Sequence, residues 1–417
     1  MNPFGRKIPR GIIYHGVMQS VHYLARALWR PLDDWDKVRQ FEAAFARYCE
    51  RSSCVAFPFA RTAIYSVLKS LDLPKGSEVI LPPITIKGIL DVVVALGLVP
   101  RYVDLDPDTI CFRMDDLRDK IGPATKAVII TPLFGLVPDM GAMIRLFREQ
   151  GVFVIEDFSQ CLNGRFDGKR IGTFGDVGIY SSSSIKTLDT LGGGLAVTDD
   201  EHLNEALHKA QADLQPPDRT FLVKKAWLNL VRNAATTQPW FSLLTFPVLQ
   251  LIRNRDPEVA LKQTGHRDKT RLAKLPELWF CRYTSVQADI GLENLGKVGA
   301  DDLARIANVD FVKSQSGAVP FPATTPYSAN VYWQSIILSP DSLAAQGFFA
   351  RRGVDIATSS LELVCALKDY PNREELSEAG QIYRNGIFIP CYPELSQADM
   401  ERVSAVVKEF FDAYVDR

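Results

Sequence analysis

The feature that most constrains the fold is a regular alternation between Val55 and Thr198, where short β-branched runs are separated by amphipathic stretches of helical periodicity. Such alternation is typical of a sheet wrapped by crossover helices. It predicts strands at Glu78–Leu81, Pro100–Val103, Lys126–Thr131, Val152–Glu156, Val177–Tyr180 and Gly194–Val197. It predicts helices at Thr62–Leu71, Lys87–Leu96, Met114–Ile121 and Asp139–Gln150. The expected fold class is therefore α/β, with a large domain built on this sheet.

The rest of the chain divides around that unit. A helical arm is expected at residues 1–50, the large domain at 51–213, an apolar helical insert at 214–275 and a smaller α/β domain at 276–417. An arm of this kind often packs on a neighbouring subunit. In the last domain we expect a long helix from Thr284 to about Val312, a strand at Val331–Leu338, and helices at Ser342–Arg352 and Asp399–Tyr414.

The insert is unusual because residues 233–252 contain no charged side chain, while Lys and Arg residues flank them. Pro239 and Pro247 interrupt the run, so a membrane-spanning helix is not expected. We expect most of its apolar side chains to be buried, with one exposed edge beside the pocket. Peripheral contact with a membrane or a lipid-linked substrate is the alternative. The side chains concerned are Trp227, Trp240, Phe241, Leu243, Leu244 and Phe246.

The charge and the cysteines indicate which class of partner and which cellular compartment to expect. The 48 basic and 49 acidic residues give a net charge of −1, which argues against a general nucleic-acid binder and favours a small-molecule partner. Seven cysteines without a CxxC or metal-ligand spacing predict reduced thiols and a cytoplasmic location. The start of the chain carries no apolar core of signal-peptide length, and no histidine lies in a metal pattern. No metal is expected.

Two residues predict the chemistry. Asp157 follows a buried strand, and open α/β sheets bind ligands beyond the carboxyl ends of their strands. Lys186 lies in a loop between four serines and Gly192–Gly194. A loop lysine can form a Schiff base, and a carboxylate can keep a pyridine nitrogen protonated, so the pair fits pyridoxal 5′-phosphate (PLP). Taken singly, Asp157 could be a cap or turn residue and the glycines a simple turn.

The segments Ile155–Gln160, Gly175–Asp176 and Ser181–Gly194 together resemble the DegT/StrS family of PLP-dependent sugar aminotransferases, of the aspartate-aminotransferase fold class (fold type I). The resemblance implies that Lys186 forms the Schiff base and shuttles the proton, while Asp157 pairs with the pyridine nitrogen. It implies that Gln160 contacts the ring oxygen and Ser181 the cofactor phosphate, with Ser183 or Ser184 as alternatives.

A second group of residues stands at positions that match the family, but several of them differ from the residue types found in relatives. Ala60, Arg61 and Thr62 open a helix where the family places a phosphate-binding Gly-Thr-Ser-like turn, so Arg61 is expected on the phosphate or in the substrate cavity. Ile86 stands where relatives stack an aromatic on the cofactor ring. In the same comparison Pro132 replaces a histidine and Phe280 replaces an asparagine that reaches a partner's cofactor phosphate, while Arg282 matches. Arg384 is a candidate for holding a donor carboxylate.

The expected function is transfer of an amino group, from glutamate, to a keto carbon of a nucleotide-linked sugar or similar polyol. Because the pocket rim departs from the family, two alternatives stay open. One is a PLP-dependent lyase, decarboxylase or aldolase acting on a non-nucleotide, lipid-linked substrate. The other is a non-catalytic sensor or scaffold. The resemblance also implies a homodimer with the cofactor near the subunit interface and a contribution from the N-terminal arm.

Overall fold

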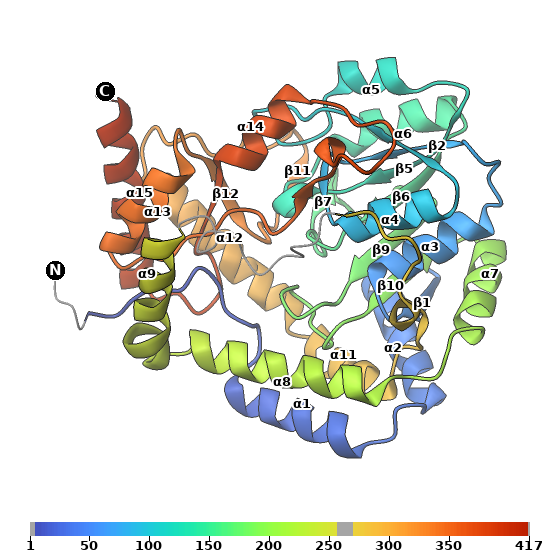
Figure 1. Ribbon diagram of the computed structural model, residues 1–417, viewed down its shortest axis with the longest axis horizontal. Helices are drawn as coiled ribbons and strands as arrows, with labels where there is room; N and C mark the ends of the chain where they lie inside the picture. The colour runs from blue at the N-terminus through green and yellow to red at the C-terminus, as the bar shows by residue number, and fades with distance from the viewer. Residues whose placement is uncertain (1–4, 257–269, 416–417) are drawn as a thin grey trace.

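The computed structural model describes residues 5–256 and 270–415, and its frame is a seven-stranded sheet of order β1-β10-β9-β6-β5-β2-β4 (Figure 1). The strands from β9 to β4 are parallel, whereas β10 runs antiparallel to both β9 and β1. The predicted α/β class is confirmed. The strands are β1 Ser53–Phe57, β2 Glu78–Leu81, β4 Val99–Tyr102, β5 Thr125–Ile130, β6 Phe153–Asp157, β9 Val177–Ser181 and β10 Gly194–Thr198.

Helices cover both faces of this sheet, which explains why its strands are almost continuously apolar. Along β5, Val128 packs in the cluster that contains Met143 and Phe147 of α6. The next residue, Ile129, packs in the opposite cluster with Ile64 of α3. The covering helices are α3 Ala60–Ser70, α4 Lys87–Ala95, α5 Met114–Lys120, α6 Met140–Glu149 and α7 Glu201–Ala212.

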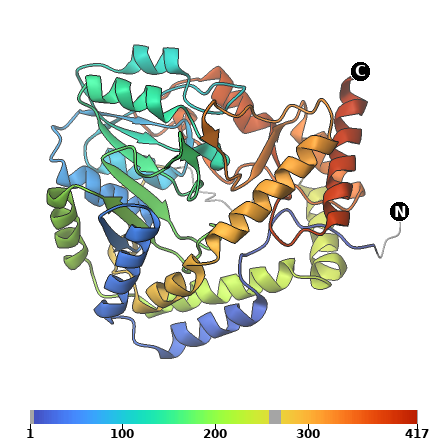
Figure 2. The same cartoon turned by 180° about the vertical axis from the view of Figure 1, so that it is seen from behind.

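The N-terminal arm forms two helices that pack within the chain. The helix α2 (Trp35–Tyr48) contributes Phe41 and Phe45 to the core beside β1. The helix α1 (Val17–Trp29) lies beside α8 along one edge of the molecule (Figures 1 and 2).

The C-terminal part is built around a two-stranded antiparallel sheet, β12 and β14, packed against α12, α13 and α15. Its elements are α11 Ser285–Leu295, α12 Val298–Gln315, β11 Ser328–Ala329, β12 Ser335–Leu338, α13 Ser342–Arg351, β13 Glu362–Leu363, α14 Ser377–Asn385, β14 Gly386–Ile389 and α15 Gln397–Val415. Three short strands elsewhere pair with them or with each other: β3 Ile84–Thr85, β7 Arg165–Phe166 and β8 Lys169–Arg170.

Two elements predicted for the C-terminal part have different bounds in the structure. The strand predicted at Val331–Leu338 begins only at Ser335, because Tyr332 adopts a left-handed φ of 47°. The backbone there runs so close to Gly135 that a Cβ on the glycine would lie 2.7 Å from the Trp333 nitrogen. The long helix predicted from Thr284 is interrupted at residues 296–297, which separate α11 from α12.

The apolar insert consists of α8 (Arg219–Thr236), a π-helical turn at Phe241–Thr245 and α9 (Phe246–Arg255). Phe241 and Phe246 are buried. Between 54% and 58% of each of the other four singled-out side chains is exposed, so the expectation of burial for most of the insert was wrong: Trp227, Trp240, Leu243 and Leu244. The physical reason is that only one side of these helices packs on the protein. Within the described ranges no helix is long and apolar enough to cross a membrane. Residues 257–269 of the predicted insert lie outside the described residues.

Candidate active site

The site lies at the carboxyl edge of the parallel strands. The strand β6 ends at Asp157, its parallel neighbour β9 ends at Ser181, and the loop after β9 carries Lys186. Asp157 and Lys186 are both buried and attract each other electrostatically. The structure therefore brings together the two residues that are 29 positions apart in the sequence.

Burial sets the protonation behaviour of this pair. Desolvation lowers the pKa of Lys186 to about 7, and the negative charge of Asp157 offsets only part of that shift. Desolvation likewise raises the pKa of Asp157, against hydrogen bonds from Ser159 and the charge of Lys186. A substantial fraction of the amine is thus uncharged near neutral pH, which is the form that attacks a carbonyl carbon.

Trp333 covers Lys186 and was not found from the sequence. The Lys186 Nζ lies 3.5 Å from the centroid of the Trp333 ring. The indole Nε1 donates a 2.8 Å hydrogen bond to the carbonyl oxygen of Ile185, the residue before the lysine. Trp333 comes from the distant segment that passes close to Gly135, and nothing in its local sequence pattern marks that contact.

Serines connect the two strand ends. The Ser159 N–H donates to Asp157 Oδ1 over 3.1 Å, and the Ser181 N–H donates to Ser159 Oγ over 2.8 Å. Ser182 is fully buried, and its hydroxyl donates to the carbonyl oxygen of Gly192 and accepts a hydrogen bond from Thr190. Among the four serines, Ser182 therefore holds the loop itself.

The glycine run allows the lysine loop to meet the start of α3. Gly193 has a φ of 138°, and a Cβ there would lie 2.5 Å from Ser182 Oγ. A Cβ on Gly194 would lie 2.3 Å from the backbone nitrogen of Ala60, the first residue of α3. Gln287 Nε2 donates to the carbonyl oxygen of Gly192 over 2.7 Å. Gly194 is therefore required by close backbone approach, and Gly193 by its positive φ and the side chains packed against it.

The first turn of α3 provides a cationic, amide-rich corner. The Arg61 guanidinium lies between two rings, 4.4 Å from the Phe59 centroid and 4.2 Å from that of Trp279. Burial lowers the pKa of Arg61 to about 10, so the side chain stays positive at neutral pH. Its buried Nε has no hydrogen-bond partner among the described residues. The Thr62 hydroxyl donates to the carbonyl oxygen of Trp279 over 2.6 Å.

This corner fits the phosphate of PLP. A buried cation with an unpartnered N–H, next to first-turn amides that lack helical partners, favours an anion. The residues available to hold the phosphate are Ala60 and Arg61 through the helix start, and Ser181 at the end of β9. The Thr62 hydroxyl is already engaged with Trp279.

The remaining candidates differ in their placement. Gln160 is buried, and its Oε1 accepts a 2.8 Å hydrogen bond from the Phe134 N–H. Ile86 precedes α4 and is 39% exposed. Phe280 packs against Tyr65 with ring centroids 5.0 Å apart.

The two candidate substrate arginines lie in other settings. Arg282 donates a 2.8 Å hydrogen bond to the carbonyl oxygen of Ala212, and its guanidinium lies 5.4 Å from the Trp35 ring centroid. Arg384 is exposed in the last turn of α14. Neither arginine is among the groups gathered around Lys186.

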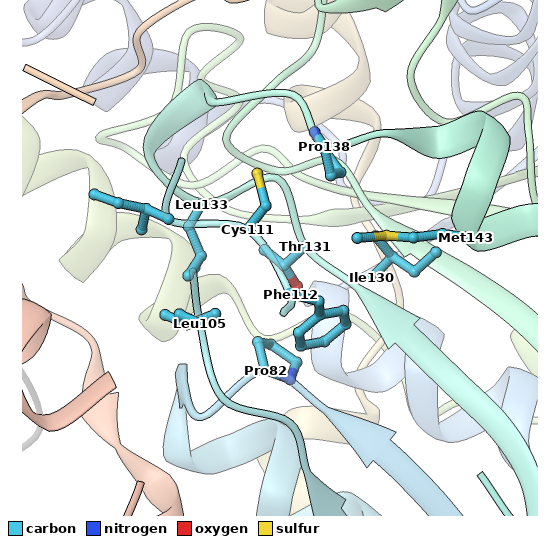
Figure 3. A pocket seen from close by; sticks show the side chains of 10 residues that line it. Pro82, Leu105, Cys111, Phe112, Ile130, Thr131, Leu133, Pro138 and Met143 are labelled. Atoms are coloured by element: carbon cyan, nitrogen blue, oxygen red, sulfur yellow. The ribbon is translucent and has the colours of Figure 1, made fainter. Parts of the chain in front are cut away.

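A hollow beside this edge is apolar and separate from the reactive pair. Its wall combines residues that follow β2 and β5 with residues of the α5 and α6 regions (Figure 3). The lining residues are Pro82, Leu105, Ile110, Cys111, Phe112, Ile130, Thr131, Leu133, Pro138 and Met143. None of them is a charged group, so we assign the chemistry to the corner formed by Asp157 and Lys186. Within the described ranges no cluster of His, Cys, Asp and Glu could hold a metal ion.

Comparison with known proteins shows which family the chain resembles. The DegT/DnrJ/EryC1/StrS aminotransferase family model matches residues 18–215. The L-glutamine:2-deoxy-scyllo-inosose aminotransferase of Streptomyces kanamyceticus is 34% identical over 175 residues, which are 42% of this chain and 41% of that protein. This match thus spans about two fifths of the relative's length. The GDP-perosamine synthase of Caulobacter vibrioides is 23% identical over 380 residues, 89% of each chain.

Solved structures show the same fold along the whole chain. An aminotransferase from Psychrobacter cryohalolentis has a TM-score of 0.75 at 20% identity, covering 98% of this chain and 100% of that one. Spr1654 from Streptococcus pneumoniae in its PLP-form has a TM-score of 0.73 at 17% identity, covering 98% and 99%. The expected fold type I architecture is confirmed. The resemblance to the DegT/DnrJ/EryC1/StrS aminotransferase family is confirmed over residues 18–215, just under half of the chain, and Spr1654 has been solved in PLP- and PMP-forms.

Proposed function

We propose that this protein is a PLP-dependent aminotransferase that moves an amino group onto the keto carbon of a nucleotide-linked sugar or a related polyol. The single observation that carries the proposal is the buried Lys186 amine, with a pKa lowered to about 7, beside the buried carboxylate of Asp157. A scaffold that only bound ligands would gain nothing from burying this pair, because desolvating two charges is costly.

Each residue has a role that follows from its position. Bound PLP supplies an electron sink that stabilises negative charge on the carbon attached to the amino nitrogen. The Lys186 amine would hold the cofactor and move the proton, and the carboxylate of Asp157 would orient the ring and keep its nitrogen positive. The start of α3, Arg61 and Ser181 hold the phosphate. As the family resemblance implies, we assign Gln160 to the ring oxygen and Ile86 to one face of the ring.

The choice of substrates follows from the relatives. Two of them are named for a sugar nucleotide and for an inosose, both of which are polyhydroxylated rings. We infer an acceptor of that class and an amino-acid donor, glutamate or glutamine. We infer that the departures from the family at Pro132 and Phe280 affect which acceptor fits.

A donor half-reaction tests the proposal. Purified protein loaded with PLP is mixed with L-glutamate or L-glutamine, and the yellow absorbance of the lysine-bound cofactor is followed. We expect bleaching by at least one donor, with one keto acid formed per site, and recovery when a keto sugar is added. Lys186→Ala should abolish the bleaching, whereas the exposed control Lys126→Ala should retain it. A lyase would release product continuously without consuming a stoichiometric donor, and that result would refute the aminotransferase assignment.

A further inference from the structure

The outer sides of α1, α8, the π-helical turn and α9 carry most of the exposed large apolar side chains of the described chain. We call these outer sides together the apolar-basic surface. Its apolar members are Met18, Val21, Leu28, Trp29, Trp227, Leu228, Val231, Trp240, Leu243, Leu244, Val248, Leu251 and Ile252. Trp29 is the most exposed of them, at 82%. The exposed large apolar residues of the remaining described chain are few and scattered: Ile86, Ile185, Leu303, Tyr327 and Leu343.

These side chains are exposed because the opposite faces of the helices are already packed. Tyr23 of α1 and Leu222 of α8 are buried in one cluster with Val286 of α11. On the same inner face of α8, Asn229 donates a hydrogen bond to Asp189, and Asn233 donates one to the carbonyl oxygen of His15. This face therefore packs against the rest of the chain. The outer apolar side chains recur every three or four residues and so form a second face of these helices, which the described chain leaves exposed.

The helices that carry this surface are strongly basic, and the acidic residues beside them are Asp218 and Asp256 at the helix ends and Glu293 next to Arg26. Residues 17–30 and 219–255 contain eight Lys and Arg and no Asp or Glu, although the whole chain has a net charge of −1. Arg26 pairs with Glu293, and Arg219 donates to carbonyl oxygens at the end of α1. Of the other six, Lys225 is partly buried near Arg61 and Asp189, and the remaining five are Arg30, Lys224, Arg232, Arg253 and Arg255.

We propose that the apolar-basic surface docks on a bilayer rich in anionic phospholipids. Helices with exposed Trp and Leu between Lys and Arg lie in the membrane interface, where the apolar side chains enter the boundary of the acyl chains and the cations meet headgroup phosphates. A two-fold contact between copies would place this surface against itself, and residues 17–30 and 219–255 offer no acidic group to neutralise the partner's cations. An anionic lipid surface satisfies both the apolar side chains and the charge.

Docking would leave the candidate active site on the protein side of α8. Asn229 on the inner face of α8 donates a 2.9 Å hydrogen bond to Asp189, three residues after Lys186. The membrane would thus lie across a single helix from the lysine loop. The inference does not depend on the proposed function, because it concerns the outer face of the same helix.

Vesicle co-sedimentation of the full chain tests the proposal. We expect binding to vesicles of mixed phosphatidylcholine and phosphatidylglycerol, weak binding to phosphatidylcholine alone, and loss of binding as salt is raised. Leu244→Ala with Leu251→Ala, and separately Lys224→Glu with Arg255→Glu, should each weaken binding about tenfold or more. The matched controls Leu303→Ala with Leu343→Ala, and Arg47→Glu with Arg118→Glu, change exposed residues elsewhere and should bind like the wild type.

Several outcomes would overturn the proposal. Failure of the wild type to sediment with anionic vesicles at low salt would do so, and this result needs no variant to fold. Equal losses in the surface variants and their controls would also do so. If light scattering showed that Leu244→Ala with Leu251→Ala splits an oligomer while the wild type ignores vesicles, the surface would instead be a contact between copies.

Discussion

At the scale of single residues, burial shifts the pKa values of a few ionisable groups in the candidate site. Lys186, Asp157 and Arg61 are all removed from water, and each is displaced toward its neutral form by desolvation. The pKa of Lys186 is lowered to about 7, so its amine changes protonation near neutral pH. Arg61, with a pKa of about 10, stays positively charged there.

Replacing Asp157 with Asn should separate cofactor retention from turnover. The variant keeps the shape and the oxygen that accepts the Ser159 N–H, but it loses the charge that holds the pyridine nitrogen protonated. We expect PLP to remain bound while kcat falls by about 10²–10³ or more, as for other losses of preorganised charge. Absorbance and steady-state rates measure the two quantities. Asp167→Asn, an exposed control, should leave both unchanged, and near-normal turnover of Asp157→Asn would remove its assigned role.

Lys186→Met should stabilise the cofactor-free protein in a pH-dependent manner. The folded-state pKa of Lys186, about 7, lies below its unfolded value of about 10.4, so the unfolded chain binds more protons between these values. The wild type consequently gains stability as pH rises through this window, and the uncharged variant does not. We expect the variant to be more stable by about 1–4 kcal/mol at pH 6, with the difference vanishing near pH 10. Urea unfolding at several pH values measures it; a pH-independent difference would show that the amine is not buried as described.

At the scale of elements, the loop after β9 is held from three sides. Gln287 of α11 donates to Gly192, Trp333 donates to Ile185, and Asn229 of α8 donates to the buried carboxylate of Asp189. Burial raises the pKa of Asp189 to about 7, so this carboxyl depends on its donors to remain ionised. The lysine is positioned by contacts from sequence-distant helices and loops, and its own short loop is not sufficient.

Asn229→Leu should therefore weaken the fold around the loop. Losing a donor to a buried carboxylate costs about 1–3 kcal/mol of unfolding free energy. Chemical denaturation measures the loss, and the exposed control Asn254→Leu should change stability by no more than about 0.5 kcal/mol. Unchanged stability of Asn229→Leu would show that the Asp189 contact contributes nothing.

At the scale of the whole molecule, the sequence predicted the sheet and the proximity of Asp157 to Lys186 because both follow from local patterns. The β-branched runs indicate where each strand ends. Because the carboxyl ends of parallel strands meet at one edge of the sheet, Asp157 and the Lys186 loop are expected to lie close together. Trp333 was missed because its contact depends on the path of residues 330–333 past Gly135, which no local pattern encodes. The exposure of the insert was missed because apolar composition predicts burial, whereas α8 has a packed face on one side only.

The whole-molecule prediction concerns assembly. The resemblance to the family implies a homodimer with the cofactor near the subunit interface, although α1 and α2 of the arm pack within their own chain. We expect light scattering of the purified protein to give twice the chain mass of 46.5 kDa. Dilution should lower the specific activity if the partner completes the site. A monomer that keeps full activity at low concentration would contradict the dimer.

The central claim is that Lys186 binds PLP beside Asp157. Borohydride reduction of the PLP-loaded protein, followed by peptide mapping, tests it most directly because reduction fixes the cofactor on the lysine that holds it. We expect a label on the peptide containing Lys186, and no label after Lys186→Ala. A label on any other lysine, or an equal label in the variant, would show that Lys186 does not hold the cofactor.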